Sequence, residues 1–91
     1  MAMVIKRSGK LEPFDEKKIK NTLATASDEV GTPLSLGDIK CIIEPVLTAV
    51  KGSDRIASKE IYDLLIKRLG ELGFWELAKA YQENSGHYRA D

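Results

Sequence analysis

The sequence predicts an α+β domain in which a four-helix bundle is capped by a small β-sheet. β-Branched residues and a Ser-Gly pair near the N-terminus are typical of a short hairpin. Farther along the chain, apolar residues recur with the spacing of one helix face. There is neither an alternation of strands and helices nor a series of evenly spaced strands, so a helical layer and a separate small sheet are expected.

Residues 3–14 are predicted to form the hairpin. The β-branched Val4 leads toward a Ser-Gly turn, where Gly9 can adopt the positive φ that a tight turn requires. Pro13 has no amide hydrogen to donate to a neighbouring strand, so it should end the second strand. Residues 55–57 are expected to add one short edge strand.

The first helix is predicted to begin after Asp15, whose carboxylate can accept hydrogen bonds from the unpaired amides of the first turn. Gly31 and Pro33 are expected to end this helix. Its apolar stripe consists of Ile19, Leu23, Ala26 and Val30.

The second helix should begin with a capping box, because Ser35 and Asp38 have the required spacing. Pro45 lies inside this helix, where it removes a backbone hydrogen bond and should introduce a kink. The apolar face continues beyond the proline, so a single helix is still expected. This face consists of Ile39, Ile42, Ile43, Val46 and Val50.

The third helix is expected to start with Ser58 as its N-cap and to stop at Gly73. The fourth should run through Trp75 and Tyr81 until residues 84–86 end it. Both aromatic side chains are interpreted as packing inside the bundle.

A chain of 91 residues, 43% of them hydrophobic, can bury one small core, so a single domain over residues 1–86 and a tail at 87–91 are expected. No apolar run approaches the ~20 residues of a membrane-spanning helix, and no signal-peptide pattern is present, which predicts a cytoplasmic protein. The lone Cys41 can build neither an internal disulfide nor a cysteine zinc site, and no metal site is expected.

Composition and motifs exclude several classes of function. Lys and Arg number 14, Asp and Glu also 14, and this balance argues against nucleic acid as a partner. Neither GxxxxGK[ST] nor GxGxxG occurs, so the common phosphate-binding loops are absent. The single histidine, His87, is interpreted as a solvated tail residue, so no catalytic residue is predicted and an enzyme is disfavoured.

Cationic residues gather near the start of the first predicted helix. Lys6 and Arg7 lie on the first strand, and Lys18 lies about one turn into the helix that Asp15 caps. Cationic side chains beside a helix N-terminus can bind an anion. On spacing alone, the simpler interpretation is that Lys6 and Arg7 are solubilising charges on a strand.

The residues from Val4 to Ile19 resemble the opening signature of the ATP-cone family. This signature is a hydrophobic strand, Lys-Arg-x-Gly, two residues, Glu-x-Phe-Asp, two residues and Lys-Ile. Ile56–Asp63 is similar to a second signature, a Ser followed three residues later by Ile, and Leu77–Tyr81 to a third, Ala-x-x-Tyr. The resemblance extends from residue 3 to about residue 83.

The resemblance implies a regulatory domain that binds ATP or dATP, with or without Mg²⁺, and that acts through a protein partner or self-association. It also implies a link to ribonucleotide reductases, as their allosteric switch or in the repressor of their genes. The implied nucleotide-binding residues are Val4, Phe14 and Ile19 against adenine, Lys6, Arg7 and Lys18 at the phosphates, Glu12 and Asp15 at the sugar or phosphates, and Ser58 and Tyr62 from the third helix. For Phe14, packing in the core is an equally good interpretation, and for Val4 and Ile19 it is the better one.

Two features depart from the family pattern. The family continues from Ala-x-x-Tyr into Tyr-Arg within one helix, whereas here residues 82–87 intervene before Tyr88. The repressor branch carries a zinc ribbon, which one cysteine cannot build. The altered C-terminal segment leaves an alternative open, an interaction module that keeps the cone fold without a ligand. A DNA-binding regulator is the third hypothesis, which the charge balance disfavours.

Overall fold

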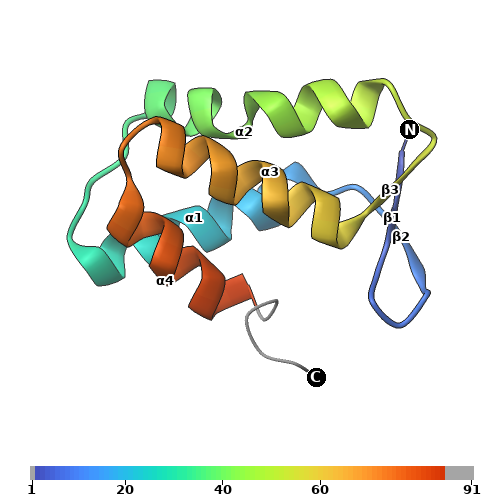
Figure 1. The fold of residues 1–91 in the computed structure, drawn as a ribbon, viewed down its shortest axis with the longest axis horizontal. Coiled ribbons are helices and arrows are strands. Elements are labelled where there is room, and N and C mark those ends of the chain that lie inside the picture. Colours follow the sequence, from blue (N-terminus) through green and yellow to red (C-terminus); the bar gives the residue numbers. More distant parts are fainter. Residues whose placement is uncertain (1, 86–91) are drawn as a thin grey trace.

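The computed structural model describes residues 2–85, and Figure 1 shows their arrangement. The predicted tail, with His87 and Tyr88, lies outside the described residues. The described part confirms the predicted α+β fold, four helices with a small sheet at one end of them. Its elements are β1 (Met3–Ile5), β2 (Leu11–Pro13), α1 (Glu16–Val30), α2 (Leu36–Lys51), β3 (Arg55–Ala57), α3 (Ser58–Glu71) and α4 (Trp75–Ser85).

The sheet has the strand order β2-β1-β3, so β1 is its central strand. β1 and β2 form the predicted antiparallel hairpin, with Val4 opposite Glu12. Gly9 has a φ of 89° in the turn, as expected, and its N–H donates to the Lys6 carbonyl at 2.9 Å. β3 is the predicted edge strand and runs parallel to β1, with Ile56 beside Val4.

Local capping sets both ends of α1, as predicted. The Asp15 carboxylate accepts a hydrogen bond from the Lys17 N–H at 3.0 Å. At the other end Gly31 adopts a left-handed conformation with φ 67°, and its N–H bonds back to the last turn. Asp15 therefore fixes the point at which the chain passes from the hairpin into a helix.

α2 begins with the predicted capping box, in which Ser35 and Asp38 each accept from the other's backbone N–H. Helical structure continues from Leu36 to Lys51 through Pro45. A proline has no N–H, so the carbonyl four residues earlier, that of Cys41, loses its partner within the helix. The Arg68 Nε of α3 donates to this carbonyl at 2.9 Å and so satisfies it from outside.

The predicted cap of α3 is wrong. Ser58 is the first residue of the helix and is buried, while Ala57 stands at the N-cap position and makes no side-chain hydrogen bond there. The reason is that Ala57 still belongs to β3, so the strand passes directly into the helix and leaves no intervening position for a capping side chain. The predicted stop at Gly73 agrees with its φ of 83°.

The two aromatic residues assigned to bundle packing differ in outcome. Tyr81 is buried, as predicted, whereas Trp75 is 70% exposed, so that its predicted burial is wrong. The Trp75 ring lies over Gly70 at the end of α3, where an added Cβ would come within 2.9 Å of the ring. Trp75 is the first residue of α4 and covers the turn, while Leu77 points into the core.

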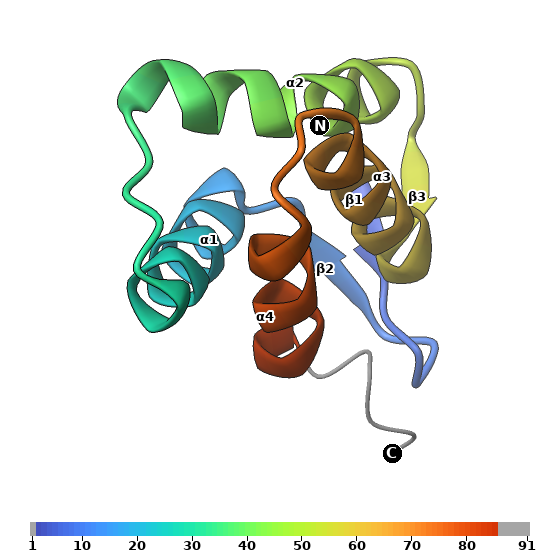
Figure 2. The same cartoon turned by 60° about the vertical axis from the view of Figure 1, so that its left-hand side comes forward.

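The core lies between the helices and under the sheet. α4 packs against α1 and α3, and α2 packs against α3. Figure 1 and Figure 2 show α3 between α4 on one side and α2 on the other. The largest fully buried side chains are Leu23, Ile42, Ile43, Leu65, Leu69, Leu77 and Val46. Within the described residues, no helix has the combination of length and apolar character needed to cross a membrane.

The hydrogen bond from Arg68 should stabilise the fold more with proline at position 45 than with a residue that has an N–H. We expect Arg68→Met to lower the free energy of unfolding by about 1 kcal/mol, since the Cys41 carbonyl then loses its protein donor. In a Pro45→Ala background, residue 45 regains an N–H for that carbonyl, so Arg68→Met should cost clearly less. Urea unfolding of the four proteins of this double-mutant cycle measures the difference. An equal cost in both backgrounds would show that the two donors do not substitute for each other.

Candidate functional site

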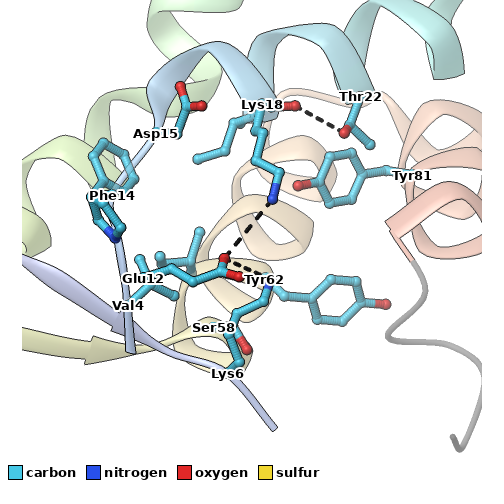
Figure 3. Close-up of a pocket in the computed structure, with 13 residues that line it drawn as sticks. Val4, Lys6, Glu12, Phe14, Asp15, Lys18, Thr22, Ser58, Tyr62 and Tyr81 are labelled. Carbon is cyan, nitrogen blue, oxygen red and sulfur yellow. Dashed lines mark hydrogen bonds and ion pairs between the residues drawn. The ribbon is translucent and has the colours of Figure 1, made fainter. Parts of the chain in front are cut away.

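A pocket of about 220 Å³ lies where the hairpin meets the first turns of α1 and α3 and the last half of α4. Its walls therefore come from segments far apart in the sequence. The lining residues are Val4, Lys6, Glu12, Pro13, Phe14, Asp15, Lys18, Ile19, Thr22, Ser58, Ile61, Tyr62 and Tyr81. Figure 3 shows how these side chains converge.

The register of the hairpin decides which strand residues face the pocket. Val4 and Glu12 lie directly opposite each other, so their side chains share one face of the sheet. Lys6 is two residues beyond Val4, and its N–H donates to the Lys10 carbonyl at 2.8 Å, which continues the ladder. Its side chain therefore emerges on the same face, because strand side chains alternate with a period of two.

Two lysines and one carboxylate form the polar end of the pocket. The Glu12 Oε2 lies 3.8 Å from the Lys6 Nζ and 3.9 Å from the Lys18 Nζ. Lys18 reaches this oxygen from α1, across the pocket from the hairpin (Figure 3). All three side chains are substantially exposed, so the cationic groups can be reached from solvent.

The N-terminus of α1 adds to this polar end. Asp15 lines the pocket and caps the helix through the Lys17 N–H. Thr22, one turn after Lys18, also lines the pocket, and its hydroxyl donates to the Lys18 carbonyl at 2.9 Å. Residues 15, 18 and 22 share one helix face, since side chains three and four positions apart are neighbours.

The apolar wall of the pocket is continuous with the core. Val4, Ile19 and Ile61 are each 8% exposed and belong to the core cluster, yet all three line the pocket. Phe14 is half-buried, packs against the same cluster and also lines the pocket. The two sequence interpretations of these residues, core and pocket wall, are therefore both compatible with the structure.

A pair of tyrosines closes the side of the pocket away from Phe14 (Figure 3). The Tyr62 and Tyr81 rings stack with centroids 6.2 Å apart and an interplanar angle of 28°. Burial raises the pKa of Tyr81 to about 12, with a smaller contribution from Tyr62. Burial also raises the pKa of Tyr62, against the lowering effect of a hydrogen bond with Gln82. Both phenols are therefore neutral near pH 7.

The structure brings nearly all of the expected nucleotide-binding residues to this one pocket. The residues from that set that line it are Val4, Lys6, Glu12, Phe14, Asp15, Lys18, Ile19, Ser58 and Tyr62. Arg7 is the exception, because it lies exposed in the hairpin turn and is not part of the lining. The expectation that Lys6 and Arg7 both lie on the first strand is therefore wrong, because β1 ends at Ile5 and the chain begins to turn at Arg7.

Sequence reasoning did not select Pro13, Thr22, Ile61 and Tyr81 as site residues, although all four line the pocket. Thr22 had a usable signal, its spacing from Asp15 and Lys18 on one helix face. Ile61 and Tyr81 were assigned to packing inside the bundle, and both are buried in the structure. Nothing local in the sequence marks which buried residues border a cavity.

The comparison with protein families shows the family of the chain. Residues 2–85 match the family described as ATP cone domain. The chain belongs to the ATP-cone family. The match covers every described residue, including the hairpin, α1 and the two tyrosines that border the pocket.

Similar curated proteins carry the name Transcriptional repressor NrdR. The chain is 33% identical to the one from Dictyoglomus turgidum over 88 residues, which is 91% of this chain and 57% of that protein. It is 35% identical to the one from Chloroflexus aurantiacus over 72 residues, or 77% of this chain and 42% of that protein. This chain thus spans about half the length of these relatives.

The relatives bear on two expectations about function. Together with the family match, they support a nucleotide-binding regulatory domain. They do not support the expectation that nucleic acid is no partner, because these relatives are named as repressors of transcription. The charge balance describes this domain alone and carries no information on the remainder of such proteins. Within residues 2–85, no group of three His, Cys, Asp or Glu side chains could hold a metal ion.

The raised pKa of Tyr81 predicts a loss of stability at alkaline pH. The unfolded chain loses this proton near the ordinary value of 10.0, whereas the folded domain holds it to about 12. The free energy of unfolding should therefore fall as pH rises through this window, by up to roughly 2–3 kcal/mol. Tyr81→Phe should remove this share of the decline, which urea unfolding at about pH 9 and about pH 11.5 would measure. An equally steep decline in the variant would assign the effect to other groups.

Proposed function

We propose that this domain binds ATP or dATP in the pocket between the hairpin, α1, α3 and α4. The single observation that carries the proposal is the convergence of Lys6 and Lys18, from two different elements, at the mouth of a pocket with an apolar interior. The phosphates would meet the lysines, and the base would enter the interior. Membership of the ATP-cone family supports the same ligand class.

The polar end suits a triphosphate. Charge-assisted contacts from two ammonium groups are strong and need no fixed geometry, because each lysine presents three donors on a flexible stem. Arg7 lies outside the pocket lining, so we assign it a weaker contact with the outermost phosphate. Any Mg²⁺ would be carried in by the phosphates, and titrations with and without this ion would separate the two forms of the ligand.

The apolar end suits a base and part of its sugar. The cavity volume of about 220 Å³ is smaller than the roughly 300–1,000 Å³ of pockets that bury a whole drug-sized ligand. We therefore place only the base and the adjoining sugar inside, and leave the phosphates along the exposed lysines. Phe14 and the Tyr62–Tyr81 pair offer aromatic surface on two sides of that space.

We place the regulatory output at α4. Tyr81 lines the pocket from α4, and α4 packs against both α1 and α3. A nucleotide that contacts Tyr81 would favour one position of this helix over another, to the extent that it binds the two states unequally. The repressor relatives support control of ribonucleotide reductase genes as the process that is regulated, through self-association or a protein partner.

Calorimetric titration of ATP, dATP and GTP into the domain tests the proposal. We expect adenine nucleotides to bind more tightly than GTP. Lys18→Ala should weaken ATP binding by about tenfold, because one charge-assisted contact is lost. Lys17→Ala is the matched control, since Lys17 is the next residue on the same helix, is exposed and does not line the pocket.

Equal effects of Lys17→Ala and Lys18→Ala would contradict this site, because they would indicate attraction by overall charge alone. A lack of heat with every nucleotide, in a folded protein, would instead favour the interaction module without a ligand.

The base-binding end can be tested separately from the phosphate end. Phe14→Ala should weaken ATP binding by roughly tenfold while tripolyphosphate binding changes little, since only ATP has a base to pack against the ring. Competition titrations with both ligands would measure this. A similar loss for tripolyphosphate would mean that Phe14 supports the fold of the hairpin and not the base.

A further inference from the structure

We infer that Glu12 occupies the phosphate site of the ligand-free domain, so that an incoming polyphosphate must displace its carboxylate from Lys6 and Lys18. The inference rests on the proposed function, because it concerns the same lysines. It differs from a role as a simple contact of the ligand, since it gives Glu12 a negative effect on phosphate affinity.

The position of the Glu12 carboxylate is the one in which it would compete with a phosphate for the two lysines. One and the same oxygen of Glu12 lies 3.8 Å from the Lys6 Nζ and 3.9 Å from the Lys18 Nζ. The carboxylate is thus an anion held between two cations that come from different segments, Lys6 directly after β1 and Lys18 in α1 (Figure 3). A phosphate oxygen would bind in the same position, because it would be attracted by the same two ammonium groups.

The strand register makes this placement unavoidable. Glu12 is the middle residue of β2 and lies opposite Val4, which lines the pocket, so its side chain must face the lysines. A substitution at this position therefore changes the charge at the lysines and leaves the ladder intact.

The contacts of Glu12 are weak enough to be displaced. Both distances exceed the roughly 2.7–3.2 Å of a good hydrogen bond from nitrogen to oxygen. The Lys6, Lys18 and Glu12 side chains are 40%, 69% and 44% exposed, so water screens both ion pairs. A polyphosphate carries several charges and more oxygens, so it competes well for the same two ammonium groups.

Inorganic tripolyphosphate is the sharpest probe, because it has no sugar with which a displaced Glu12 could bond. We expect Glu12→Gln to bind tripolyphosphate about tenfold more tightly than the wild type at low salt, since a negative charge near the bound anion is removed. The gain should shrink as salt is added. A role for Glu12 as a contact of the sugar alone predicts no gain for tripolyphosphate and weaker binding of ATP.

Glu71→Gln is the matched control. It makes the same change in net charge on an exposed side chain at the last residue of α3, about 14 Å along that helix from Tyr62, the last residue of α3 that lines the pocket. We expect its tripolyphosphate affinity to stay close to that of the wild type. Thermal melts of both variants confirm that each is folded.

The outcomes separate this inference from the proposed function. If the wild type binds ATP and Glu12→Gln binds tripolyphosphate no more tightly than the wild type, the inference is overturned and the function stands. If neither protein binds ATP but Glu12→Gln still gains affinity for tripolyphosphate, the proposed function fails and the inference stands. If neither protein binds tripolyphosphate or ATP, both are overturned.

Discussion

The pairing of β1 with strands on both of its sides determines where the hairpin and the start of α3 border the pocket. The antiparallel pairing with β2 places Val4 and Glu12 on one face, and the parallel pairing with β3 places the start of α3 directly beside that face. The sheet has only short strands, so most of its stability comes from the helices on which it packs. A shift of one residue in the β1–β2 register would place Glu12 and Val4 on opposite faces of the sheet, so that only one of them could face the pocket.

The helix ends supply the second constraint. Asp15 starts α1 immediately after the hairpin, and this fixes the rotation of the helix relative to the sheet. Lys18 and Ile19 then face the pocket from adjacent positions, one at its polar mouth and the other in its apolar wall. A single turn of helix thereby brings a charge and an apolar surface to the two ends of one cavity.

Features with a local chemical cause were predictable from the sequence. The turn at Gly9, the cap at Asp15 and the capping box at Ser35 each depend on residues within a few positions of one another. Features that depend on distant segments were not. The hydrogen bond from Arg68 to the Cys41 carbonyl joins residues 27 positions apart, and the exposure of Trp75 follows from how α4 meets Gly70. The same holds for the site, where Lys18 could be selected from its motif, while Tyr81 was identified only as a buried residue.

The ion pairs of Glu12 connect these constraints to regulation. A sensor must change state when its ligand arrives, and a site with two unopposed cations would hold whatever anion is abundant. With Glu12 between Lys6 and Lys18, the three side chains carry only a small net positive charge, so monovalent anions gain little on entering. Under the proposed function, a nucleoside triphosphate would displace the carboxylate because it has several charges, and its base would then contact the tyrosine pair that belongs to α3 and α4. Charge at the mouth would, under the same proposal, select for a polyphosphate, and contact between the base and Tyr81 would transmit its presence to α4.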